Sequence, residues 1–313
     1  MNFRSLDYCT GPRIPQTFEG FQGLLDKPLD VQILQRAFEL LPAQIQLAHT
    51  KQQAQWVYNR ARQLPGSSTK LFARQHSGLL INGDFLPNVV SRSTLVYAFK
   101  DRVPVLLKIR SHEGAEHEAA VWEALTQTCP KPPGLAGPIK VLQLKGSAGQ
   151  AGRLGLQMPL YPATLQHMPK PLPAQDVLVI GKQVLDGLLH MHQCGWAHCD
   201  VKAPNIFVKD DGSAVLGDYG AARMLGGDAD EKTLSHIASD LPAAFQVDKA
   251  SEQLDQYLLA VTLLEKLDLL QLGPGVLTTA AVRRAAGQVL AGGSADLHAF
   301  IISLLKAIAH ESG

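Results

Sequence analysis

The sequence predicts an α+β fold in which a small β-rich part precedes a mainly helical part. Between about residues 86 and 160, short runs rich in β-branched and aromatic residues alternate with turn residues, as in strands and hairpins. After residue 161, apolar residues recur at helical spacing. Hydrophobic residues make up 46% of the 313 residues, which is enough to fill a substantial core.

The composition is that of an ordinary globular protein. There are 29 basic and 28 acidic side chains, so the net charge of +1 creates no overall field that would attract a polyanion, and nucleic acid is not an expected partner. Four cysteines are too few for a disulfide framework, and the first fifteen residues lack the apolar core of a signal peptide. The longest apolar stretches are about half the roughly 20 residues that cross a bilayer. We therefore expect a protein of the cytoplasm or nucleus, neither secreted nor membrane-spanning; its oligomeric state is left open.

Residues 1–85 are predicted to form a partly helical N-terminal extension. One helix begins near Leu29 and is broken at Pro42, and a second ends before Pro65. Five positive charges and no acid occur between Glu39 and Asp84, which fits either a contact with nucleic acid or an acidic protein or, more simply, a solvated helix face. The extension serves either as a packing segment or as a docking surface.

Residues 86–160 are expected to contain two hairpins and one helix. NVVSRSTLVYAF and VPVLLKIR flank the turn-like KDR, and IKVLQLK and RLGLQMPLY flank the flexible GSAGQAG. Between the hairpins, EGAEHEAAVWEAL has helical character. After residue 161, a stripe of apolar residues from Val177 to Met191 predicts a helix that ends at Gly195.

The stretch HMHQCGWAHCD, residues 190–200, raises the question of a metal site. His190, His192 and Cys194 would lie at i, i+2 and i+4 on a helix, and residues at i and i+2 do not face each other. No Cys-x-x-Cys motif occurs in the chain. We therefore interpret these histidines as residues at a helix end rather than as zinc ligands.

The continuation HCDVKAPNIFVKDDGSAVLGDYG predicts a hairpin with chemistry at one end. Residues 206–208 and 214–216 are strand-like, and Asp211-Gly212 is a strong turn. In an antiparallel hairpin the start of the first strand lies beside the end of the second, so Asn205 and Asp218 should meet. Their oxygens suit magnesium.

These residues resemble the protein kinase superfamily. His198-Cys199-Asp200 with Asn205 is similar to its catalytic loop, Lys202 stands where the serine/threonine branch usually has lysine, and Asp218-Tyr219-Gly220 is similar to its Asp-Phe-Gly. The resemblance, which runs from about Leu86 to Glu265, implies a bilobal kinase-like fold over residues 86–313. A β-rich N-lobe would span about 86–160, and a helical, shortened C-lobe would span about 161–313.

The resemblance also implies roles for single residues. Lys108 would hold the α and β phosphates of ATP and would pair with Glu118, with Glu116 as the second choice. Asp200 would accept the proton of the attacking hydroxyl and Lys202 would stabilise the transferring phosphate, while Asn205 and Asp218 would bind Mg²⁺. Asp255 would accept hydrogen bonds from catalytic-loop amides. Met158 and Leu160 would lie at the adenine site.

The sequence departs from the family pattern in several places. The glycine-rich phosphate loop aligns with residues 89–96, which contain no glycine, so the side chains of Ser91 and Ser93 would have to contact phosphate instead. Cys199 replaces an arginine that in many relatives binds an activating phosphate. We therefore do not expect Thr233, Ser235 or Ser239 to be obligatory activating sites. No Ala-Pro-Glu motif is present.

The leading functional prediction is an atypical, compact kinase that transfers phosphate from ATP to serine or threonine hydroxyls of proteins. One alternative is a pseudokinase or scaffold that binds nucleotide without turnover, which the missing glycines would suit. The other is a kinase acting on a small molecule.

Overall fold

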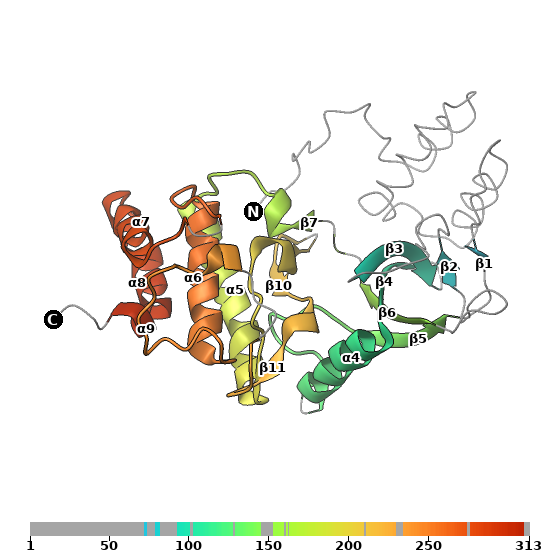
Figure 1. Ribbon diagram of the computed structural model, residues 1–313. Coiled ribbons are helices and arrows are strands. Elements are labelled where there is room, and N and C mark those ends of the chain that lie inside the picture. Colours follow the sequence, from blue (N-terminus) through green and yellow to red (C-terminus); the bar gives the residue numbers. More distant parts are fainter. Residues whose placement is uncertain are drawn as a thin grey trace, which may run out of the picture. The chain divides into compact units, whose positions relative to one another are not determined.

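A computed structural model describes residues 72–73, 79–81, 93–100, 103–127, 129–144, 153–159, 161, 163–209, 211–229, 234–273 and 276–309 (Figure 1). The chain divides into two compact units. The first comprises residues 1–119 and 137–162, and the second comprises residues 120–136 and 163–313. The β-rich part and the helical part therefore form separate units, as in the predicted bilobal α+β fold.

The first unit contains a six-stranded antiparallel sheet with the order β1-β2-β3-β4-β6-β5. Both predicted hairpins are present in it, as the pairs β3–β4 and β5–β6. The strands are β1 (Phe72–Ala73), β2 (Leu79–Ile81), β3 (Ser93–Lys100), β4 (Val103–Arg110), β5 (Lys140–Leu144) and β6 (Arg153–Pro159).

Strands β1 and β2 lie inside the segment 1–85 that we expected to be an extension. Residues Leu79–Ile81 pair with β3, so the sheet begins earlier in the chain than residue 86. Their runs of two and three residues are too short to show strand periodicity in the sequence. The helices predicted between Leu29 and Leu64 fall outside the described residues.

Helix α4 (His112–Thr126) follows β4 after a single residue and begins alongside the sheet (Figure 1). Ala115, in its first turn, packs with Leu154 and Leu156 of β6 in a small buried cluster. This contact fixes the start of the helix against the sheet. The end of the helix and the loop to Ala136 belong to the second unit, because the backbone of Ala136 and Gly134 exchanges hydrogen bonds with Leu216.

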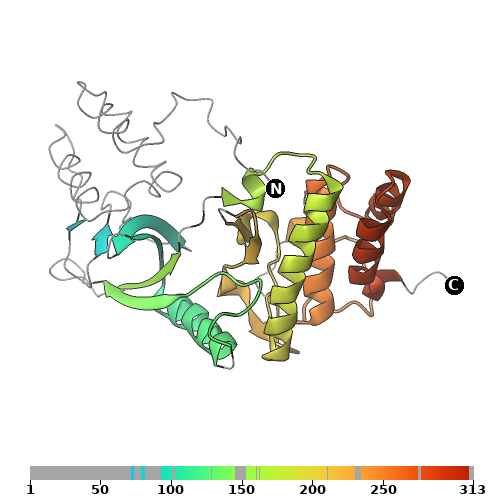
Figure 2. The same cartoon turned by 180° about the vertical axis from the view of Figure 1, so that it is seen from behind.

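The second unit is built on helices α5 (Ala174–Gln193) and α6 (Glu252–Lys266), which pack side by side (Figure 2). The apolar stripe of α5 is buried from Val177 to Met191, as predicted. The helix ends at Gln193 with Cys194 as its C-cap, and Gly195 follows with φ +83°, a backbone conformation that glycine adopts without strain. Helices α7 (Thr279–Ala291), α8 (Ala295–Leu304) and α9 (Lys306–Ala309) complete the unit.

Helix α6 is surrounded by protein on nearly all sides. Its run from Tyr257 to Leu264 is buried throughout, which explains why the sequence there is apolar without helical periodicity. In the part of the chain that the structure describes, no helix combines the length and the apolar character that a membrane span requires. The longest apolar stretches of the sequence, residues 257–267 and 298–309, lie in α6 and in α8 and α9, respectively.

Small strands and 3-10 turns, most of them between α5 and α6 in the chain, carry the residues that the sequence motifs singled out. Strands β9 (Ile206–Val208) and β10 (Ala214–Leu216) form the predicted hairpin and are joined by β7 (Ala163–Thr164). Strand β8 (Trp196–Ala197) pairs with β11 (Arg223–Met224). The 3-10 turns are η3 (Leu165–His167), η4 (Ala203–Asn205), η5 (Tyr219–Ala221) and η6 (Leu234–His236).

Candidate active site

The loop between β8 and β9 is held by one buried carboxylate of α6. Asp255 is fully buried, and its two oxygens accept hydrogen bonds from the backbone N–H groups of His198 and Cys199, both at 2.7 Å. The predicted contact of Asp255 with loop amides is confirmed. His192, near the end of α5, adds a third contact through Nε2 at 2.9 Å.

This anchoring explains a strained backbone. Cys199 has φ +64°, a left-handed conformation that costs a residue with a side chain about 1–2 kcal/mol. The turn at Cys199 lets two successive backbone N–H groups point at the carboxylate of Asp255. These hydrogen bonds form only in the left-handed conformation, and they offset its strain. The loop is therefore held in one conformation.

Asp200, Lys202 and Asn205 converge within this loop. Oδ2 of Asp200 lies 2.7 Å from Nζ of Lys202 and accepts a hydrogen bond from Nδ2 of Asn205 at 3.0 Å. The same Nδ2 donates to the backbone oxygen of Asp200 at 2.8 Å. The exposed fractions of the Asp200 and Lys202 side chains are 16% and 27%, so a substrate can reach both.

The hairpin brings the backbones of Asn205 and Asp218 to one end, as expected. Ile206 is paired with Leu216, and the N–H of Gly217 donates to the oxygen of Asn205 at 2.9 Å. Asp218 has φ +64° and its carboxylate accepts a hydrogen bond from the N–H of Gly220.

The donor set at this end suits a hard divalent cation. Nδ2 of Asn205 donates both of its hydrogen bonds to Asp200. The side-chain oxygen of Asn205 is therefore the atom that can accept a hydrogen bond or bind a metal ion. An amide oxygen and a carboxylate are the kinds of ligand that Mg²⁺ uses together with phosphate oxygens. The residues therefore fit the ion.

The histidines before the loop have other partners. Nε2 of His190 lies 2.8 Å from the backbone oxygen of Leu125, whereas His192 contacts Asp255. Among the described residues, no three acidic, histidine or cysteine side chains form a group that could hold a metal ion.

Tyr219 connects the catalytic loop to α4. Its hydroxyl donates to the backbone oxygens of Ala136 and Leu216 at 2.8 and 3.0 Å. Its ring centre lies 6.0 Å from that of His198 and 5.9 Å from that of Trp122. His198 in turn contacts the backbone oxygen of Gly217 through Nε2 at 3.0 Å. Sequence reasoning did not connect Trp122 with this group.

In the first unit, Lys108 of β4 pairs with Glu118 of α4. Nζ of Lys108 lies 3.1 and 2.9 Å from the two carboxylate oxygens, and both side chains are buried. The predicted pairing is thus confirmed. Glu116, the second choice, is exposed and lies 3.3 Å from His112 instead.

Arg110 also reaches this carboxylate, which sequence reasoning missed. Its Nη1 lies 3.2 Å from Oε2 of Glu118. The available signal was the spacing: Lys108 and Arg110 are two residues apart in a predicted strand and so lie on the same face.

The predicted nucleotide-binding residues are placed only in part. Met158, half-buried in β6, is the Cα partner of Leu106 in β4. Ser93 is the first residue of β3, opposite Arg110, and residues 93–96 belong to that strand rather than to a loop. The second half of the segment aligned with the phosphate loop is therefore paired backbone of β3. Ser91 and Leu160 fall outside the described residues.

Cys199 has an unreactive environment. The side chain is fully buried, and burial together with the nearby charge of Asp255 raises the pKa of its thiol to about 12. Of the three hydroxyls considered above, Ser235 contacts His236 and Ser239 donates to Leu277, whereas Thr233 lies outside the described residues.

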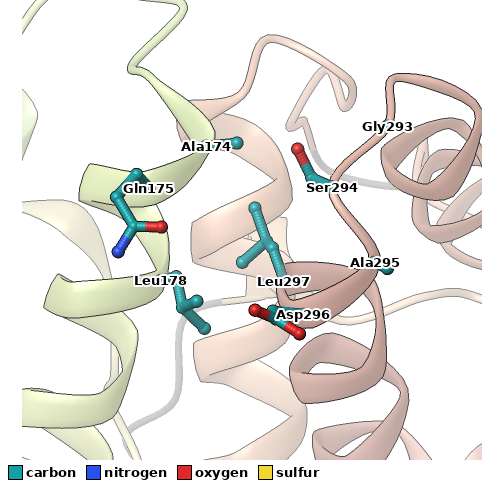
Figure 3. A pocket seen from close by; sticks show the side chains of 8 residues that line it. All are labelled: Ala174, Gln175, Leu178, Gly293, Ser294, Ala295, Asp296 and Leu297. Atoms are coloured by element: carbon teal, nitrogen blue, oxygen red, sulfur yellow. The ribbon is translucent and has the colours of Figure 1, made fainter.

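A pocket of about 340 Å³ opens between the starts of α5 and α8 (Figure 3). Gln175, Ser294 and Asp296 give it polar edges around Leu178 and Leu297. None of its lining residues is a predicted site residue. Nothing in its lining points to catalysis.

Comparison with known proteins shows that the segment carrying this loop is similar to a known family. Residues 139–268 match the family described as protein kinase domain, a range that contains Asp200, Asp218 and Asp255 but not Lys108 or Glu118. Over 149 residues the chain is 30% identical to a serine/threonine-protein kinase US3 homolog of varicella-zoster virus, which covers 47% of this chain and 35% of that protein.

Two further similarities are shorter or weaker. The chain is 44% identical over 57 residues to mitogen-activated protein kinase kinase kinase 20 of Arabidopsis thaliana, covering 18% of this chain and 17% of that protein. The structure of the Cydia pomonella granulovirus kinase PK-1 aligns with a TM-score of 0.47 and 18% identity, over 65% of this chain and 73% of that one. The chain thus spans about a third or less of the length of these two curated relatives.

Proposed function

Because residues 139–268 match the protein kinase domain family, we propose that this chain transfers the γ-phosphoryl group of ATP to serine or threonine hydroxyls of protein substrates, with Mg²⁺ as cofactor. The observation that carries the proposal is the convergence of Lys202 and Asn205 on one oxygen of Asp200, in a loop anchored by Asp255. Such a fixed carboxylate is what a hydroxyl nucleophile requires.

Asp200 orients the hydroxyl of the substrate and takes its proton. The hydroxyl oxygen forms a bond to the γ-phosphorus while the bond to the bridging β–γ oxygen breaks, and ADP leaves with that electron pair. Because Nζ of Lys202 lies 2.7 Å from Oδ2 of Asp200, its positive charge lies beside the reacting hydroxyl. It stabilises the negative charge of the transferring group.

Asn205 and Asp218 would hold the magnesium ion, which when bound would neutralise the phosphate charge. Lys108, aligned by Glu118, holds the α and β phosphates, and Met158 and Leu160 contact the adenine. Ser91 and Ser93 supply the phosphate contacts that glycine amides make in other members of the family.

A second candidate function is nucleotide binding without turnover. It is favoured by the aligned phosphate-loop residues 89–96, where glycines are replaced by larger side chains. Both functions use the same residues for ATP, and they differ only in whether phosphate moves.

The test is phosphate transfer from Mg-ATP to a generic basic protein. Asp200→Asn and Asp218→Asn should each lower turnover by about a hundredfold or more. Asp228→Asn is the matched control. Asp228 is also an aspartate, but it is exposed and pairs with Lys249. Wild-type protein that is thermally stabilised by Mg-ATP without transferring phosphate supports the binding function, and transfer only to small molecules overturns the protein-substrate proposal.

A further inference from the structure

The carboxylate of Glu118 is shared by two cations of the same strand. Lys108 contacts both of its oxygens, and Nη1 of Arg110 lies 3.2 Å from Oε2. Glu118 is fully buried, and the exposed fraction of the Arg110 side chain is 16%. A family lysine–glutamate pair needs one cation, so the second one calls for an explanation.

The local structure makes room for Arg110. It lies two residues after Lys108 in β4, so both side chains leave the same face of the strand. Across from it, Gly114 stands in the first turn of α4, where an added Cβ would come within 3.2 Å of Nε of Arg110. Glycine is unfavourable inside a helix, and here it leaves space for the guanidinium group.

The polar contacts of Arg110 converge on Glu118. Its Nε is buried and has no hydrogen-bond partner among the described residues. The contact of Nη1 with Oε2 of Glu118 is therefore the interaction that holds the guanidinium group in place. Hydrogen bonds between two charged groups are about twice as strong as neutral ones. Arg110 is thus attached to the first half of α4 rather than to solvent.

We propose that Arg110 is a positioning residue: it holds Glu118 against β4 independently of Lys108 and thereby keeps the Lys108 ammonium group aligned for the phosphates of ATP. The inference rests on the proposed function. Lys108 has a long, flexible side chain, and its alignment depends on where the carboxylate stands. With Arg110 in place, the carboxylate stays in position even while Lys108 engages phosphate.

A double-mutant cycle tests this on the full chain, with Mg-ATP affinity measured by calorimetry. Arg110→Met keeps the apolar stem and should weaken Mg-ATP binding about tenfold, whereas in a Glu118→Gln background the same change should have less than about a twofold effect. Arg110→Lys keeps the charge and should recover part of the affinity. Lys140→Met removes a positive charge from an exposed position of β5 and should leave binding unchanged.

Gly114→Ala gives a second route that alters no charge. Its methyl group would come 3.1 Å from Oγ of Ser111 and 3.2 Å from Nε of Arg110, so the guanidinium group should shift by a few tenths of an ångström. Mg-ATP binding should then weaken slightly in the wild-type background but not in the Arg110→Met background. Gly114→Ala also keeps the inference testable if Arg110→Met fails to fold. Urea unfolding of each variant shows whether it is folded.

Equal weakening by Arg110→Met in both backgrounds, or no weakening in either, overturns the role of Arg110. Phosphate transfer by the wild-type protein is measured in the same preparations. Coupled binding without transfer contradicts the proposed function alone, and transfer without coupling contradicts the Arg110 inference alone. A wild-type chain that binds no Mg-ATP contradicts both.

Discussion

Asp255 accepts the backbone N–H of Cys199 at 2.7 Å, although 56 residues separate the two in the chain. A charge on the central helix of one unit thereby sets the backbone of the loop that carries Asp200. The carboxylate lies where water cannot replace either partner, so its removal affects both stability and the geometry of the loop.

Replacing Asp255 by Asn should destabilise the protein by about 2–4 kcal/mol, because an amide cannot accept from two N–H groups with both of its polar atoms. Urea unfolding measures the change. Glu252→Gln, at an exposed position in the first turn of the same helix, should change stability by less than about 0.5 kcal/mol. Equal effects of the two substitutions would show that the anchoring of the loop contributes nothing.

Two helical glycines should respond oppositely to alanine. At Gly287 of α7 an added Cβ meets nothing within 4 Å, so Gly287→Ala should stabilise the protein by about 0.5–1 kcal/mol. At Gly187 of α5 it would come within 2.6 Å of the backbone oxygen of Gly134, so Gly187→Ala should destabilise by more than about 1 kcal/mol. Thermal unfolding compares them, and stabilisation by both contradicts the packing of the Gly134 loop on α5.

Lys266 should make stability rise with pH. It is buried and donates to the backbone oxygen of Met168 at 2.8 Å, and burial, aided by the charge of Lys170, lowers its pKa to about 8 from 10.5. Between these values the unfolded chain holds a proton that the folded chain has released, so protonation favours unfolding below about pH 8 and the penalty fades toward pH 10.5.

The measurement is the difference in unfolding free energy between wild type and Lys266→Met from pH 7 to 10. From pH 7 to 10, the unfolding free energy of the wild type should rise relative to that of the variant by on the order of 1–3 kcal/mol. Taking the difference removes the opposite trend from Tyr257, whose pKa burial raises to about 12. A pH-independent difference would contradict the lowered pKa of Lys266.

Cys199 should resist alkylation in the native protein. Its thiol is buried and its pKa is raised to about 12, so almost no thiolate is present near neutral pH. Cys129 and Cys194 are half-buried free thiols and should react with iodoacetamide first. Peptide mass spectrometry follows each site, with labelling of Cys199 expected only under unfolding conditions. Rapid labelling of Cys199 in the folded chain would point to a redox-sensitive thiol instead.

Local patterns predicted much of the fold. The turn Asp211-Gly212 between two strand-like runs was enough to predict the hairpin that brings Asn205 beside Gly217, because turn type and strand register are set by neighbouring residues. The spacing of apolar residues predicted α5 for the same reason. Strands β1 and β2 were missed, since two or three residues carry no periodicity.

By itself, the sequence determined which residues could do chemistry and the hairpin around Asp211. Its resemblance to a known family implied the pairing of Lys108 with Glu118, with Glu116 as the second choice, and the structure decided for Glu118. Only the tertiary structure decided that Arg110 shares Glu118, that His192 joins the loop amides on Asp255, and that Trp122 meets Tyr219. The physical reason is range. Turns and helix faces follow from interactions a few residues apart, whereas these contacts depend on how separate elements pack, and burial then determines the strength of each one.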